Sequence, residues 1–127
     1  MKNNPVDAIE VNVASNYLPA ESDPEQSRYT FSYTVTITNR GQRAARLMTR
    51  HWIIVDSSGK KQEVQGDGVV GEQPYLKPGE AFQYSSGTII ETPAGIMEGK
   101  YHMVTDSGER FTAEIPPFAL AVPQMLH

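Results

Sequence analysis

Three glycines at the spacing of a phosphate-binding loop are the most suggestive chemical feature of the sequence. Gly66, Gly68 and Gly71 form the pattern G-x-G-x-x-G, with which a dinucleotide-binding protein packs its backbone against a pyrophosphate. That chemistry requires a helix whose N-terminus follows the last glycine and faces the phosphates. Here Pro74 and Pro78 follow Gly71, and a proline inside a helix costs about 3 kcal/mol. The sequence therefore excludes a Rossmann-type dinucleotide site.

Two interpretations of the glycine segment remain open. In the first, the glycines supply positive φ angles or allow close packing at a bend between strands. In the second, successive amides form a surface nest that binds a small anion such as pyrophosphate, and the protein handles phosphates or nucleotides. Val69 and Val70, which lie between the glycines, fit either a buried staple or an exposed apolar contact.

A second candidate site lies on the strand that precedes this segment. Strict alternation places five side chains on one face: Arg46, Met48, Arg50, Trp52 and Ile54. Arginine and tryptophan are favoured at interface hot spots, so Arg46, Arg50 and Trp52 are candidates for binding a partner or an anion. In the alternative interpretation, Trp52 belongs to the core and the arginines pair with local carboxylates. A β-bulge would rotate part of this pattern.

The histidines show no spacing typical of a metal site. His51, His102 and His127 are far apart, and neither His-x-His nor His-Glu-x-x-His occurs. A metal-binding protein remains an alternative if two strand histidines meet across neighbouring strands beside a carboxylate, but we assign no metal ligand. Because the sequence has no cysteine, it has no thiol nucleophile and no cysteine-ligated metal.

No catalytic motif is present either. The sequence has no Gly-x-Ser-x-Gly elbow and no phosphate loop that ends in Gly-Lys-Ser/Thr. The carboxylates are scattered, and several lie in predicted turns, where they cap or solvate the chain: Asp56, Asp67, Asp106 and Glu109. We therefore expect a non-enzyme without a cofactor.

The elements that position these residues are almost all strands. Alternation with period two over 9–17 and 29–39 is typical of half-buried strands. Further strands are predicted over 44–55, 60–65, 81–88, 96–104 and 110–115, and Pro116-Pro117 is expected to end the last of these before a short extended piece. Segment 22–25 has the spacing of a capping box and predicts a single helical turn. Seven or eight strands with frequent turn signals indicate a β-sandwich or barrel.

Two antiparallel sheets are favoured over one. An antiparallel sheet must cover its apolar face, and without a long helix a second sheet has to supply the cover. The 127 residues are sufficient for one domain over 1–127. We expect residues 1–7 to be flexible.

Composition and charge limit the classes of partner that we expect this protein to bind. The formal net charge of −4 gives no basis for nucleic-acid binding. No stretch approaches the roughly 18 apolar residues of a membrane span, and the first residues show no secretory signal. We expect a cytoplasmic protein that contacts neither nucleic acid nor membrane.

An ordered series of motifs resembles the ApaG family and covers nearly the whole chain. Its segments are Arg50-His51-Trp52-Ile53-Ile54, Gly66 to Pro74, Leu76-Lys77-Pro78-Gly79-Glu80, Tyr84 to Thr88, Thr92-Pro93, Gly99 to Val104 and Ile115-Pro116-Pro117-Phe118. The resemblance implies a fibronectin-type-III or immunoglobulin-like sandwich.

The resemblance implies less about activity. Bacterial members of the family are small stand-alone proteins of unsettled role that are associated with cobalt and magnesium homeostasis. Similar domains in larger eukaryotic proteins, including F-box proteins and a DNA-polymerase-delta-interacting protein, are thought to contact partners. There is no family catalytic residue to carry over. We expect a non-catalytic module that binds a protein partner, with a surface that includes the Gly66–Gly71 segment and the Arg50–Trp52 strand.

Overall fold

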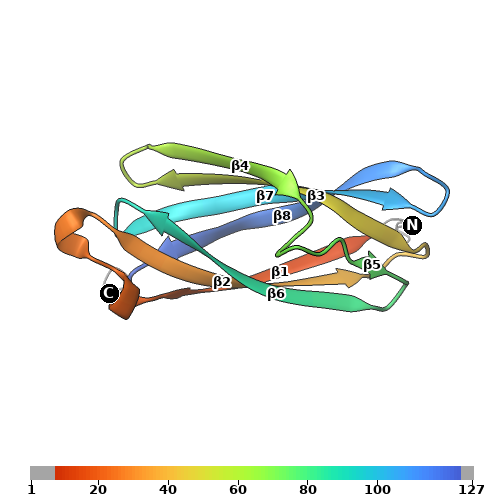
Figure 1. Cartoon of the computed structure of the whole chain (residues 1–127), viewed down its shortest axis with the longest axis horizontal. Helices are drawn as coiled ribbons and strands as arrows, with labels where there is room; N and C mark the ends of the chain where they lie inside the picture. Colours follow the sequence, from red (N-terminus) through yellow and green to blue (C-terminus); the bar gives the residue numbers. More distant parts are fainter. Residues whose placement is uncertain (1–7, 124–127) are drawn as a thin grey trace, which may run out of the picture.

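The computed structural model describes residues 8–123, which form two antiparallel β-sheets packed face to face (Figure 1). The smaller sheet has the order β1-β2-β6 and consists of β1 (Ile9–Tyr17), β2 (Tyr29–Asn39) and β6 (Ala81–Ile90). The larger sheet has the order β4-β3-β7-β8, with β5 paired to β3. Its strands are β3 (Ala45–Asp56), β4 (Lys61–Asp67), β5 (Tyr75–Leu76), β7 (Ala94–Thr105) and β8 (Arg110–Ala121). The predicted two-sheet antiparallel sandwich is confirmed, while the expectation for residues 1–7 falls outside the described residues.

Alternation explains why the strands of the smaller sheet form. In β2, Phe31, Tyr33, Val35 and Ile37 are buried between the sheets, and the intervening threonines and serine are turned outward. β-Branched and aromatic side chains suit such a half-buried pleated surface. The outward side is covered with hydroxyl groups, which bond to one another across strands, as between Thr34 and Ser85. The bounds predicted for β1 and β2 are confirmed.

The connection between β1 and β2 contains two short 3-10 turns, η1 (Pro19–Glu21) and η2 (Pro24–Gln26). The predicted single turn corresponds to η2, but Asp23 makes no side-chain cap there. The Ser22 hydroxyl instead donates to Leu18 O and accepts from the amide of Thr30. Across residues 8–123, no helix has the length and apolar character needed to traverse a bilayer.

A bulge in β3 changes which side chains face the core. The β3–β7 register shifts between Leu47 and Thr49, so Met48 is the extra residue. Before the bulge Ala45 and Leu47 are buried, and after it the buried positions are Trp52 and Ile54. The strict alternation expected for β3 is therefore wrong. Odd-numbered residues face the core before the bulge, and even-numbered residues face it after the bulge.

A second bulge explains why two prolines lie inside β8. The expectation that Pro116-Pro117 ends the strand is wrong, because β8 continues to Ala121. The β7–β8 register shifts between Met97 and Gly99, where both prolines face a single residue of β7. Prolines are tolerated in a strand at a bulge or at the edge of a sheet, and β8 offers both at this point.

Aromatic rings link the two sheets in the core. Trp52 of β3 is only 2% exposed and meets Tyr33 of β2 nearly edge-on at 5.4 Å between ring centroids. Phe118 and Tyr101 contact the same indole at 6.0 and 6.4 Å. Beside them the hydroxyls of Tyr84 and Tyr101 form a buried 2.5 Å hydrogen bond between the sheets. This bond satisfies two polar groups that would otherwise be costly to bury.

Two buried polar side chains hold the strand ends. Asn39, 1% exposed, donates to Arg43 O and Leu76 O and accepts from the amide of Gly41. Asp56 Oδ1 accepts bonds from the Ser58 hydroxyl and from the amides of Ser58 and Lys60. The Ser58 hydroxyl contributes most to keeping the pKa of Asp56 below its usual value. Asp56 thus caps the β3–β4 hairpin, as expected for a turn carboxylate.

Candidate functional site

The glycine segment leaves β4 and returns to β3 without forming a helix. Gly68 donates its amide to Met48 O, and Val69 and Glu72 exchange both backbone hydrogen bonds. The chain then enters β5, which the sequence did not predict, and turns at Lys77–Glu80. The exclusion of a Rossmann-type helix after Gly71 is confirmed.

Arg50 reaches into this segment from β3. One of its terminal nitrogens donates to the carbonyl oxygens of Asp67, at 2.9 Å, and Gly68, at 3.0 Å. Gly66 lies directly opposite Arg50 in the ladder, and a Cβ atom built on Gly66 would be 2.9 Å from both terminal nitrogens of Arg50. The guanidinium therefore occupies the space that a side chain at Gly66 would need.

The segment is consequently arranged around an internal cation. Carbonyl oxygens, which attract cations and repel anions, point at Arg50, and the amides of Gly68, Val69 and Glu72 donate to backbone carbonyls. Gly68 has φ +60°, and a Cβ atom there would overlap Glu72 O. This geometry agrees with the structural interpretation of the glycines and gives no support to the anion nest.

The two valines between the glycines have opposite environments. Val69 is fully buried in the core cluster, whereas Val70 is 55% exposed and has φ 43°. A positive φ at a β-branched residue is uncommon and strained. Val69 thus fixes the segment to the core and leaves Val70 projecting into solvent.

The other predicted site residues do not come together as one patch. Arg46 precedes the bulge and points outward, where it lies over the Tyr75 ring and donates to Gln73 O. Arg50 follows the bulge and points toward the glycine segment. Trp52 lies in the core, as the alternative interpretation held. Arg46 and Arg50 therefore belong to different faces of β3.

A tyrosine cluster lies beside Arg50 between the sheets. Burial raises the pKa of Tyr84 to about 12, although its hydrogen bond to Tyr101 acts in the opposite direction. Burial likewise raises the pKa of Tyr101 and that of Tyr33, while the positive charge of Arg50 lowers each of them slightly. All three hydroxyls are neutral at physiological pH, so the cluster is a structural network.

Exposed apolar and charged side chains lie together on the outward side of β3, β7 and β8, which we call the outer face. It consists of Thr49, His51, Ile53, Val55, Ile96, Glu98, Lys100, His102, Val104, Arg110, Thr112 and Glu114. Val55 and Ile96 lie opposite each other and are 37% and 47% exposed. This mixture of apolar and charged side chains contrasts with the hydroxyl-covered outward side of β2.

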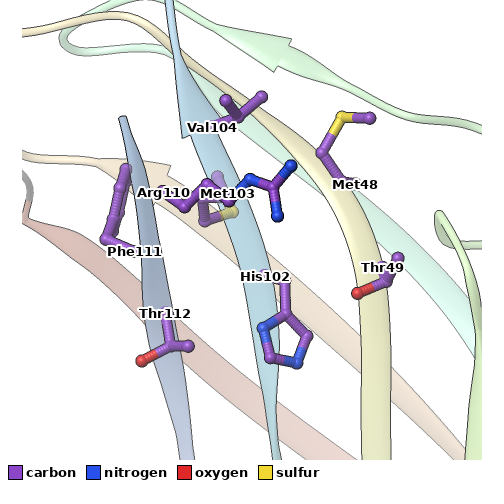
Figure 2. Close-up of a pocket in the computed structure, with 8 residues that line it drawn as sticks. All are labelled: Met48, Thr49, His102, Met103, Val104, Arg110, Phe111 and Thr112. Carbon is purple, nitrogen blue, oxygen red and sulfur yellow. The ribbon is translucent and has the colours of Figure 1, made fainter. Parts of the chain in front are cut away.

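Three adjoining hollows run along the outer face. The largest, of about 520 Å³, lies at the Met48 bulge (Figure 2). It shares Thr49 and His102 with a second hollow, which shares His51 and Lys100 with a third near Pro116 and Pro117. Each bulge thus lies beside a hollow at one end of the series.

The strand histidines lie on this face. His102 is opposite Thr49 in the β3–β7 ladder, and both His51 and His102 line the second hollow. His51 Nε2 lies 2.7 Å from Glu63 Oε2. No three His, Cys, Asp or Glu side chains within residues 8–123 are grouped so that they could hold a metal ion. His127 lies outside the described residues.

The sequence reasoning missed Arg110, Thr112 and Met48 as members of a surface site. They belong to β8 and β3, which reach the same hollow from either side of β7. Only the strand order and the bulge bring them together, and neither is encoded in a local motif. The bulge itself had no signal beyond the conflict between Leu47 and Trp52, two large apolar residues on opposite predicted faces.

The comparisons with known proteins agree with the architecture. The ApaG domain family model matches residues 19–105. A protein ApaG from Shewanella sp. (strain MR-4) is 57% identical over 121 residues, which is 95% of this chain and 96% of the relative. A protein ApaG from Aromatoleum aromaticum is 53% identical and covers 94% of both chains.

Solved structures give the same result. An X-ray structure of a structural genomics target superposes with a TM-score of 0.89 at 54% identity and covers 94% of this chain and 91% of the other. The crystal structure of a protein described as ApaA from Bordetella pertussis superposes with a TM-score of 0.90 at 48% identity, covering 94% and 99%. With the family model, the near-full-length identity and the sandwich all in agreement, this chain belongs to the ApaG family.

Proposed function

We propose that this protein is a non-catalytic binding module that contacts a protein partner through the outer face of its larger sheet. The observation that carries the proposal is the combination on one uncovered sheet face of exposed apolar residues with three adjoining hollows. One side of an antiparallel sheet commonly faces water. Hollowed apolar surface rimmed by polar residues, however, is typical of an interaction site.

The side chains of the hollow at the Met48 bulge favour binding over catalysis. Its residues include one imidazole and two threonine hydroxyls but no carboxylate that could orient the imidazole as a base: Met48, Thr49, His102, Met103, Val104, Arg110, Phe111 and Thr112. Nucleophilic catalysis needs a base in contact with both a nucleophile and an orienting group. In this proposal the protein acts in the cytoplasm, and the link of the family to cobalt and magnesium balance is indirect, through the partner.

Site-specific photo-crosslinking in the native cells tests the proposal. A benzophenone amino acid would replace Thr112 on the outer face or, as a matched control, Ser85 on the outward side of the smaller sheet. Both are exposed hydroxyl-bearing strand residues. We expect discrete crosslinked proteins from position 112 only. The absence of adducts, or the same adducts from both positions, would contradict the proposal.

A further inference from the structure

The hollow at the Met48 bulge carries a cation whose charge is not compensated within the described residues. Arg110 begins β8, and in Figure 2 its guanidinium lies over β7, between His102 and Met48. It forms no hydrogen bond or ion pair with any of the residues 8–123. None of the residues that line the hollow is acidic.

The two acidic residues of the β7–β8 turn are engaged elsewhere. Asp106 and Glu109 lie in the β7–β8 turn, just before Arg110. Asp106 accepts the Tyr75 hydroxyl, at 2.8 and 2.9 Å from its two oxygens, and Glu109 pairs with Arg43. The fold therefore directs both turn carboxylates away and leaves Arg110 available for an external acid.

A row of polar side chains accompanies Arg110. Thr49, His102 and Thr112 lie opposite one another across β3, β7 and β8, at the roughly 4.8 Å spacing of neighbouring strands. Arg110 lies two residues before Thr112 on the same side of β8, opposite Val104. A guanidinium can bind a carboxylate with two parallel hydrogen bonds. Here two hydroxyls and an imidazole lie within reach of the same ligand.

The remaining lining of the hollow is apolar. Met48 contributes from the β3 bulge, and Val104 and Phe111 contribute from β7 and β8. A ligand that fits must combine one negative charge with an apolar group. A carboxylate meets this description better than a phosphate, which brings a charge of about −1.5 to −2, and better than a nucleic acid, which needs an array of cations.

We propose that this hollow recognises an acidic residue next to an apolar one in an extended segment of a protein partner. The acidic side chain binds Arg110, and the apolar side chain contacts Met48 and Val104. A volume of about 520 Å³ lies within the range of sites that hold a few amino-acid side chains. The inference rests on the proposed function and adds the chemistry of the partner.

Amide chemical shifts test the inference directly. The ¹⁵N-labelled protein would be titrated with acetyl-Glu-Leu-Phe-amide and with its uncharged counterpart, acetyl-Gln-Leu-Phe-amide. We expect the glutamate peptide to shift the amides of Thr49, His102 and Thr112. The glutamine peptide should bind about tenfold more weakly, the value of one charge-assisted hydrogen bond.

Substitutions at two arginines provide the matched comparison. Arg110→Gln should lower the affinity for the glutamate peptide about tenfold, to that of the glutamine peptide. Arg28→Gln removes the same charge from an exposed arginine near η2 and should leave the affinity unchanged. Circular dichroism and the amide spectrum of each variant would verify that the fold is kept.

Four results would overturn the inference. Equal affinity for the two peptides would show that the carboxylate does not contribute to binding. Unchanged affinity in Arg110→Gln would show that Arg110 does not contribute. Binding of 3-phenylpropionate as tight as that of the peptide would assign the hollow to small acids. If position 112 crosslinks as strongly in Arg110→Gln as in the natural sequence, this inference fails alone. If the peptide binds but position 112 gives no adduct, the proposed function fails alone.

Discussion

The guanidinium of Arg50 lies where a Cβ atom of Gly66 would be, and Gly66 is the residue paired with Arg50 across β3 and β4. This contact explains why a phosphate-loop spacing occurs in a protein without a phosphate-loop fold. The first glycine makes room for an arginine, and the second adopts a positive φ beside a backbone carbonyl. In this protein the glycine segment therefore contacts a cation of the same chain, the Arg50 guanidinium, whereas the glycine loop of a Rossmann fold binds an anionic ligand.

The Arg50–Gly66 contact can be measured by a double-mutant cycle. Gly66→Ala should displace the guanidinium from Asp67 O and Gly68 O and destabilise the fold by about 1–3 kcal/mol. In an Arg50→Met background the same substitution should cost clearly less, because the displaced group is gone. Urea unfolding of the four proteins gives the coupling energy. Additive effects would show that the contact is unimportant.

The second and third glycines of the motif should respond differently to substitution. An alanine methyl at Gly68 would overlap a backbone carbonyl, that of Glu72, whereas the space around Gly71 is open. Both glycines have positive φ, which costs alanine about 1 kcal/mol. We expect Gly71→Ala to lower the free energy of unfolding by about that amount and Gly68→Ala by at least about 2 kcal/mol. Thermal unfolding would rank them, and equal losses would contradict the geometry.

The buried tyrosines predict a loss of stability at high pH. Burial raises the pKa of Tyr84 to about 12 and also raises that of Tyr101, while in the unfolded chain both ionise near pH 10. Above pH 10 the unfolded state therefore binds fewer protons than the folded state, and stability falls as pH rises toward 12. Each such tyrosine contributes up to about 1.4 kcal/mol per pH unit.

Urea unfolding between pH 8 and pH 11 would measure this slope. The Tyr84→Phe/Tyr101→Phe double variant removes both hydroxyls together and leaves neither without its partner. Its stability should fall less steeply above pH 10 than that of the natural sequence. The same slope in both proteins would assign the alkaline loss to other groups.

Trp52 is the single tryptophan of the chain and therefore a direct reporter of its own position. Because it is packed against Tyr33, Tyr101 and Phe118, acrylamide should quench its fluorescence weakly in the folded protein and strongly in urea. Addition of a binding partner should leave the quenching unchanged. Strong quenching of the folded protein would place Trp52 at the surface.

Asn39 should be among the most sensitive polar positions. Its side chain satisfies three backbone groups while almost fully buried. Asn39→Ala should cost about 2–3 kcal/mol, because those groups lose their partner where water has little access. Asn12→Ala, at an exposed position on β1, is the control and should change stability by no more than about 0.5 kcal/mol. Calorimetry of both variants checks the difference.

The fold was largely predictable because period-two alternation depends only on local residue types. In β2 the pattern from Tyr29 to Asn39 is uninterrupted, and its bounds are confirmed. Glycines and prolines mark the hairpin turns in the same local way. The short β5 was missed, since two residues are too few to show a period and it forms only by pairing with β3.

The candidate site was not predictable for a related physical reason. Because Met48 is an extra residue in β3, each residue that follows it faces the opposite side from the one that alternation predicts. Arg46, Arg50 and Trp52 therefore form no common patch: Arg46 lies at the surface, Arg50 contacts the glycine segment, and Trp52 lies in the core. Bulge positions are set by pairing with β7, which a single strand does not encode. The Arg110 hollow depends on three strands that are distant in sequence.

The paired prolines of β8 also bear on self-association. An exposed edge strand invites lateral pairing with another molecule, the route by which many β-proteins aggregate or form fibrils. Pro116 and Pro117 have no backbone N–H to donate, and β8 is irregular at the bulge that they occupy. The bulge that accommodates the prolines within β8 therefore also makes this strand a poor template for lateral pairing with a foreign strand.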